Sequence, residues 1–132
     1  HSAVEKNIGK IISIVKLDGI TKGKNDELGS KLAMHIAASN PLAINKDEIE
    51  KSIVDKELEI IKAEIINTGK PAEIAEKISK GKISKFLNDN SLLNQEWIMD
   101  PKKKVSDVLK ENSSDTPLQI LDFARFKVGE GV

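Results

Sequence analysis

A chain of 132 residues with 21 basic and 21 acidic side chains has no net formal charge at pH 7, so no overall field attracts it to nucleic acid or to anionic lipid. The absence of cysteine excludes a disulfide scaffold, a thiolate metal site and a cysteine nucleophile, and no apolar run approaches the ~20 residues needed to cross a bilayer. We therefore expect one soluble domain of the cytoplasm that recognises its partners locally.

Residues 9–19, "GKIISIVKLDG", are the first predicted element, a strand rich in β-branched side chains that ends at the turn pair Asp18-Gly19. Apolar side chains fall on both faces of this strand. This pattern predicts that other elements cover much of both faces or that the strand lies at a sheet centre.

Residues 26–40 predict a helix that Asp26 caps and that ends before Pro41. Its expected core residues surround well over half of the helix: Leu28, Leu32, Met34, His35, Ile36 and Ala38. A histidine in so apolar a helical turn is compatible with four roles: a metal ligand, a general base, a pH switch or a packed core residue. We interpret His35 as a core residue whose ring nitrogens bond to backbone or to a neighbouring loop, because periodic segments predict burial better than they predict roles.

Residues 45–69 are the longest periodic segment of the chain. Val54, Leu58, Ile61 and Ile65 repeat at four, three and four residues, the narrow seam of a coiled coil. Gly69 and Pro71 are suited to ending this helix and starting the next, which continues to about Leu87. The short connection predicts an antiparallel helical hairpin, inserted over residues 47–88, whose charged outer faces are solvated surface.

Residues 91–101, "SLLNQEWIMDP", are predicted to be irregular and partly extended, with Trp97 anchored in the core. Adjacent apolar side chains in such a segment point in different directions, so Ile98 and Met99 cannot both be buried with it. Residues 103–113 predict a short helix and residues 119–131 a strand that ends in a glycine-rich turn. Val105, Val108 and Leu109 are expected to face inward from the helix. The strand is expected because Ile120, Ala124, Phe126 and Val128 alternate against Asp122.

These elements predict an α+β fold for residues 1–132: a small antiparallel sheet covered by helices, with the coiled-coil hairpin projecting from it. Residues 11–17 are expected to pair with residues 120–128. Because two strands alone are marginal in water, we expect a third strand from residues preceding His1 or from another copy of the chain.

No residue pattern points to catalysis. His1 and His35 lack metal-ligand spacing, the loop "TKGKND" lacks the glycine spacing of a phosphate loop, and no serine has a histidine and an acid in a recognisable motif. We therefore expect no catalytic residue, no metal and no cofactor. Direct binding of nucleic acid by the lysine-bearing second helix and by residues 102–104 is disfavoured, since 3% aromatic residues provide few stacking platforms.

Three segments in order carry a family resemblance: "MHIAASNP", the hairpin with the residues that follow it, and "FARFKVGEG". Together they resemble elongation factor Ts, the nucleotide-exchange factor of elongation factor Tu. The opening "HSAVEKNIGKIISIV" is similar to the first strand of the family's second core subdomain. The sequence departs from the family at Glu96, where proline is usual, and it lacks the ubiquitin-associated-like module and the first core subdomain with its Thr-Asp-Phe-Val motif.

The resemblance implies a factor that accelerates GDP release without a chemical step of its own. In the family the missing Asp-Phe pair approaches the nucleotide pocket of elongation factor Tu, while the second core subdomain holds Tu through its third domain. By this resemblance, Ile98 and Met99 match positions that touch Tu. His1 matches a position close to that interface, and the alternative for His1 is a disordered chain end. The alternative is a structural or self-associating module, with a homodimer as a possible assembly.

Overall fold

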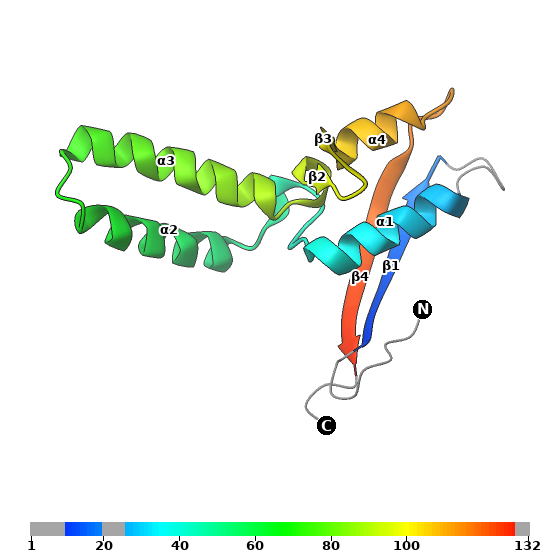
Figure 1. The fold of residues 1–132 in the computed structure, drawn as a ribbon, viewed down its shortest axis with the longest axis horizontal. Coiled ribbons are helices and arrows are strands. Elements are labelled where there is room, and N and C mark those ends of the chain that lie inside the picture. The colour runs from blue at the N-terminus through cyan, green and yellow to red at the C-terminus, as the bar shows by residue number, and fades with distance from the viewer. Residues whose placement is uncertain (1–9, 20–25, 129–132) are drawn as a thin grey trace. The chain divides into compact units, whose positions relative to one another are not determined.

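The computed structural model describes residues 10–19 and 26–128, which form two compact parts (Figure 1). One part contains the described residues up to Asn40 together with those from Trp97 onward, and the other is the continuous segment Pro41–Glu96. Helices and antiparallel strands give the α+β class predicted from the sequence. No helix within the described ranges is long and apolar enough to cross a membrane.

Strands β1 (Lys10–Asp18) and β4 (Gln119–Val128) form the sheet of the first part and pair antiparallel, as predicted. Ile12 lies opposite Phe126 and Ile14 lies opposite Ala124. At the end of β1, Gly19 has a φ of +84°, and a Cβ there would collide with the carbonyl oxygen of Pro117. The predicted Asp18-Gly19 turn therefore requires glycine for both its conformation and its space.

Only one face of this sheet carries a helix in the described part of the chain. Helix α1 (Asp26–Ser39) packs on β1, where the Ser13 hydroxyl donates to the Ala33 carbonyl and Arg125 Nε donates to the Ala37 carbonyl at 3.1 Å. Ser13 and Arg125 are register partners, so their side of the sheet faces α1. The predicted cover on much of both faces is therefore wrong for the described residues.

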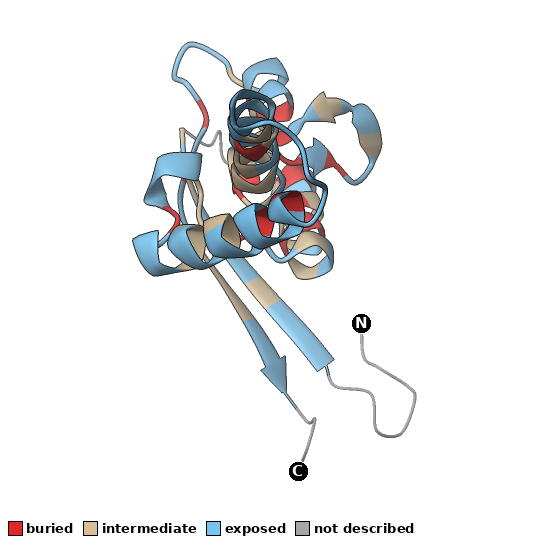
Figure 2. Cartoon of the chain, turned by 90° about the vertical axis from the view of Figure 1, so that its left-hand side faces the viewer, coloured by how far each residue is buried: buried red, intermediate tan, exposed pale blue. Residues whose placement is uncertain are grey.

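The opposite face exposes apolar side chains: Ile12 at 42%, Ile14 at 57%, Phe126 at 52% and Val128 at 42%. Figure 2 shows exposed residues along much of both strands. Phe126 and Val128 thus lie on the exposed face of the sheet, whereas Ile120 of the same strand is buried. The reason is a shift in register, which places Lys16 opposite Asp122 but Leu17 opposite Ile120, and thereby reverses the alternation of side chains in β4.

Helix α1 buries a narrower stripe than the sequence suggests. Leu28, Leu32, His35 and Ile36 are buried, whereas Met34 is 56% exposed and Ala38 is also exposed. At about 100° per residue, Met34 lies roughly 200° around the helix from Leu32. One helix lying on one sheet face buries only the side turned toward it, so the prediction of burial for Met34 and Ala38 is wrong.

The elements that follow the second part are short, and β2 (Glu96–Trp97) lies at the boundary, since Glu96 belongs to the second part and Trp97 to the first. Strands β2 and β3 (Asp100–Lys104) pair with each other, and helix α4 (Val105–Glu111) packs against β3. Asp107 caps α4 by accepting a hydrogen bond from the Lys104 amide at 3.0 Å. The helix buries Val105, Val108 and Leu109, as predicted.

The second part contains helices α2 (Lys51–Ile66) and α3 (Ala72–Asp89), which pack along each other as the predicted hairpin. Helix α2 begins later than expected because Lys46–Glu48 forms a separate 3-10 turn. Ile61 and Ile65 of the predicted seam are buried, whereas Val54 and Leu58 are half-buried because a two-helix hairpin covers each helix from one side only.

Two short backbone bonds close the base of this hairpin. The Leu42 amide donates to the Asn90 carbonyl, and the Leu92 amide donates to the Ala43 carbonyl, both at 2.8 Å. A second 3-10 turn, Leu92–Asn94, follows and buries Leu92. The segments before α2 and after α3 are thereby tied side by side, so the second part has its own closed base.

Candidate functional site

Ile98 and Met99 form the turn between strands β2 and β3. Their side chains are 39% and 45% exposed, respectively. Their predicted position on the surface is confirmed, and the physical reason is that a tight turn between paired strands cannot direct both side chains into the core. The turn therefore presents two adjacent apolar side chains to solvent, while their contact with a partner stays a prediction.

His35 supports this turn from the core. Its ring is fully buried, and Nδ1 accepts a hydrogen bond from the Ile98 amide at 3.3 Å. An accepting Nδ1 means that the imidazole is neutral and carries its proton on Nε2. The prediction of a core histidine bonded to a neighbouring loop is confirmed, and that loop is the one that carries Ile98 and Met99.

Trp97 lies against the same imidazole. The two ring centroids are 5.3 Å apart and the planes differ by 20°, a stacked arrangement. The indole is only 5% exposed, which confirms the predicted core position of Trp97. Stacking thus holds Trp97, the residue before the exposed turn, and a hydrogen bond holds Ile98, the first residue of the turn. Two separate interactions with His35 therefore attach the turn to the core.

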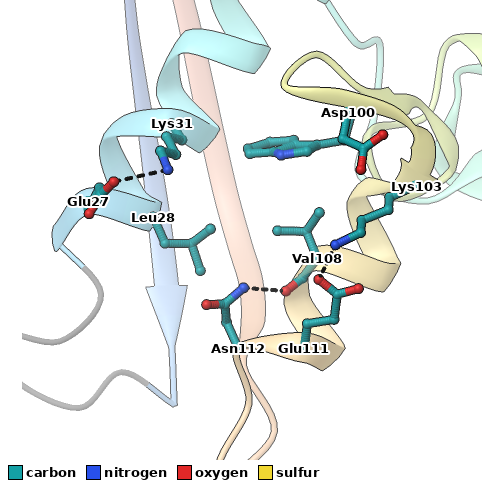
Figure 3. Close-up of a pocket in the computed structure, with 9 residues that line it drawn as sticks. Glu27, Leu28, Lys31, Asp100, Lys103, Val108, Glu111 and Asn112 are labelled. Atoms are coloured by element: carbon teal, nitrogen blue, oxygen red, sulfur yellow. Dashed lines mark hydrogen bonds and ion pairs between the residues drawn. The ribbon is translucent and has the colours of Figure 1, made fainter.

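A cleft of about 280 Å³ lies beside Trp97 within the first part of the molecule. Its lining residues come from α1, β2, β3 and the α4 region: Glu27, Leu28, Lys31, Trp97, Asp100, Lys103, Val108, Glu111 and Asn112. Figure 3 shows Leu28 and Val108 turned toward the interior, with the charged side chains around them. The cleft therefore combines an apolar floor with a charged rim.

Ion pairs organise this rim. Lys31 Nζ lies 3.0 Å from Glu27, and Lys103 Nζ lies 2.8 Å from Glu111 (Figure 3). The hydrogen bond and the charge of Glu111 raise the pKa of Lys103 above its ordinary value. Asp100 accepts a bond from the Lys102 amide at 3.2 Å but has no lysine partner in the described ion pairs. Three carboxylates and two ammonium groups leave the rim with one excess negative charge.

The sequence did not point to this cleft. Glu27 and Lys31 have the i, i+4 spacing of an ordinary surface pair, and Lys103 and Glu111 are eight residues apart across the change from strand to helix. His1, the third predicted partner-binding residue, lies outside the described residues. Within residues 10–19 and 26–128, no group of three or more acidic, histidine or cysteine side chains gathers to hold a metal ion.

Comparison with known proteins identifies the relatives of this chain. A family model described as Elongation factor TS matches residues 1–130. The elongation factor Ts of Orientia tsutsugamushi (strain Boryong) is 38% identical over 135 residues, which cover 100% of this chain and 44% of that protein. The chain belongs to the elongation factor Ts family.

Two further relatives extend this finding. The elongation factor Ts of Ectopseudomonas mendocina (strain ymp) is 44% identical over 116 residues, covering 86% of this chain and 39% of that protein. The one from Pasteurella multocida (strain Pm70) is 39% identical over 127 residues, covering 95% of this chain and 44% of that protein. The chain thus spans about four tenths of the length of the curated relatives it matches.

Membership of the elongation factor Ts family confirms the resemblance read from the sequence motifs. The family match includes the Ile98–Met99 turn, the cleft and the helical hairpin, since it extends from residue 1 to residue 130. The turn and its support by His35 therefore lie within the part of the chain that matches the elongation factor Ts family.

Proposed function

We propose that this chain is the part of an elongation factor Ts that holds elongation factor Tu in its GDP-bound form, and that it thereby contributes to the exchange of GDP for GTP. The observation that carries the proposal is the exposed pair Ile98 and Met99 on a turn anchored to the core by His35 and Trp97. Family membership supports the choice of partner.

An anchored apolar turn is well suited to a protein contact. Binding costs free energy when loops and side chains must be ordered, and a turn already fixed by a stacked ring and a hydrogen bond loses less of that freedom. Neighbouring apolar side chains at the centre of an interface commonly provide most of its binding energy. We propose the third domain of elongation factor Tu as the surface that receives Ile98 and Met99.

Holding Tu and releasing its nucleotide are separable tasks. An exchange factor works because its binding and the binding of GDP weaken each other by the same factor. The Thr-Asp-Phe-Val motif, which the family resemblance places at the nucleotide pocket, does not occur in the 132 residues of this sequence. We therefore expect this chain to bind Tu while accelerating GDP release far less than a full-length factor.

Further assignments rest on the same proposal. We infer that residues 1–132 are the family's second core subdomain, with a hairpin inserted over 47–88, and the continuous compact segment Pro41–Glu96 supports such an insertion. His1 is a proposed neighbour of the Tu interface. The protein is proposed to work in the cytoplasm as an exchange factor that catalyses no bond making or breaking.

The test measures binding and release separately. Calorimetry with elongation factor Tu bound to GDP is expected to show a complex, and the release of a fluorescent GDP analogue from Tu is expected to accelerate only slightly. Absence of a complex would overturn the holding role. Release as fast as with an intact elongation factor Ts would overturn the division of tasks, because the chain would then contain everything that exchange requires.

A second copy of the chain is the other partner to be tested. The sheet face opposite α1 exposes Ile12, Ile14 and Phe126, and burial of such a face is a common source of dimer stability. Sedimentation equilibrium of the chain with and without Ile14→Lys distinguishes a homodimer from a monomer. The family assignment favours Tu binding over self-association alone.

A further inference from the structure

A groove lies at the end of the helical hairpin, where helix α2 leads into α3. It encloses about 450 Å³, and its lining residues are Lys62, Ile65, Ile66, Lys70, Ala72, Ala75, Glu76 and Ser79. All of them belong to the second compact part, so the groove shares no residue with the Ile98–Met99 turn. Figure 1 shows the loop that joins α2 to α3 at this end of the hairpin.

The floor of the groove is apolar and partly uncovered. Ile65 is 6% exposed and belongs to the seam between the helices, whereas the neighbouring Ile66 is 77% exposed. Helix α3 contributes small side chains, Ala72, Ala75 and Ser79, to the same groove. Because these side chains are short, they leave room beside Ile66 that larger residues would fill. An isoleucine this exposed beside a hollow can bury its surface only against another molecule.

The charges around this floor are positive on balance. Within the described residues, neither Lys62 nor Lys70 forms an ion pair, although both line the groove. The single lining carboxylate, Glu76, is already 3.5 Å from Lys80. Two uncompensated ammonium groups therefore border an exposed isoleucine. Carboxylates brought to this border would gain attraction without displacing an existing partner.

From this combination, we propose that the groove binds an acidic amphipathic helix of another protein. The apolar side chains of such a helix, spaced by three or four residues, enter the hollow beside Ile66, and its carboxylates meet Lys62 and Lys70. The groove contains no aromatic side chain on which a nucleic-acid base would stack. A flat anionic membrane is the poorer match, since electrostatic membrane binding usually needs a cluster of about four to eight basic residues.

The test uses the whole 132-residue chain and a defined probe. The probe is a fluorescent helical peptide of about 15 residues with leucines along one face and glutamates beside them. A matched peptide with lysines in place of the glutamates reports the role of charge. Vesicles containing anionic lipid provide the membrane comparison. Binding is measured by fluorescence anisotropy at low and high salt, since screening weakens exposed charge pairs.

Two groove variants and one matched control locate the site. Lys62→Glu with Lys70→Glu is expected to weaken binding of the acidic peptide by about tenfold or more, and Ile66→Ser by a similar factor. Lys56→Glu with Lys77→Glu makes the same change of charge on α2 and α3, at two residues that do not line the groove, and is expected to leave affinity unchanged. All these side chains are exposed, so far-UV circular dichroism is expected to show unaltered helicity.

Each contrary outcome overturns the proposal. Equal affinity for the acidic and basic peptides would show that the lysines do not select acidic side chains. An equal loss of affinity in the groove variants and the control variant would show that the peptide does not bind in the groove. Binding to anionic vesicles without binding to the peptide would assign the surface to lipid. Because elongation factor Tu takes no part in these measurements, their failure would leave the proposed role of Ile98 and Met99 unaffected.

Discussion

The imidazole of His35 stacks on the indole of Trp97, with 5.3 Å between the ring centroids. Its Nδ1 also accepts a hydrogen bond, at 3.3 Å, from the amide of Ile98, the residue that follows Trp97. One buried side chain therefore fixes two consecutive residues of the chain in different ways, one by stacking and the other by a hydrogen bond. The relationship links the core of the first part directly to its exposed apolar turn.

Replacing His35 by phenylalanine separates these two functions. The stack on Trp97 is retained, whereas the Ile98 amide loses its acceptor, a change that costs about 1–3 kcal/mol when the amide stays buried. Hydrogen exchange of the Ile98 amide is expected to accelerate, and Tu binding to weaken. His35→Ala, which removes both contacts, is expected to lower Tm further. Unchanged exchange at Ile98 in the phenylalanine variant would mean that the hydrogen bond does not hold the turn.

Truncating Ile98 and Met99 together to alanine tests the proposed interface. Both side chains are substantially exposed, so the fold is expected to be nearly unaffected, while binding to elongation factor Tu falls by about 1–3 kcal/mol. Calorimetry gives the binding free energy and a thermal melt gives the stability. Ile60→Ala with Ile74→Ala is the control, since these residues are 46% and 48% exposed on the hairpin. An equal loss in both double variants would show a nonspecific effect.

Trp97→Ala, by contrast, is expected to lower the stability of the fold rather than to remove a direct contact with elongation factor Tu. The indole is buried between His35 and the cleft floor, so its removal leaves a cavity that costs about 3–5 kcal/mol. The measurement is the midpoint of urea unfolding, with Trp97→Phe as the smaller change. A variant as stable as the parent chain but unable to bind Tu would make Trp97 a contact residue rather than a core residue.

The hairpin seam offers a matched pair of neighbouring positions. Ile61→Asp places a charge at a residue that is 3% exposed and is expected to separate the two helices, with a clear loss of far-UV helicity. Ile60→Asp puts the same charge on an adjacent residue that is 46% exposed and is expected to keep the hairpin. Leu58→Asp, at a half-buried position, is expected to fall between them.

The first compact part is expected to survive separation of the hairpin. Trp97 belongs to that part and stacks on His35 within it, so the near-ultraviolet signal of the indole is expected to stay unchanged in Ile61→Asp. Loss of that signal together with helicity would show that the two parts unfold as one cooperative unit.

Local signals made several features predictable. The α1 helix begins at Asp26 and ends before Pro41, as its capping and stop residues indicate. Hydrophobic spacing located the hairpin and the buried seam residues Ile61 and Ile65. The pairing of β1 with β4 was predictable because few alternatives remained for two distant strands. Such signals depend only on neighbours within a few turns of the chain.

Features that depend on distant contacts were predicted less well. Met34 has an apolar side chain at a plausible helical position, but only the placement of α1 on a single sheet face determines that it is exposed. The exposure of Phe126 likewise depends on a distant contact, because the register shift between β1 and β4 near Leu17 cannot be predicted from the sequence of either strand alone. Exposure of Ile98 was predictable from its neighbours, and so was a hydrogen bond between His35 and some neighbouring loop. The identity of the partner, the Ile98 amide 63 residues away, was not predictable.

The sheet of the first part has a consequence for the order in which the molecule can assemble. Val128 is the register partner of Lys10, so the sheet joins residues separated by nearly the whole described chain. The hairpin, by contrast, closes through contacts between helices that a short connection joins. Joining distant segments costs more chain entropy and slows folding. During synthesis, the hairpin can therefore form while β1 still lacks its partner, and the apolar side chains of β1 stay unpaired until β4 has left the ribosome.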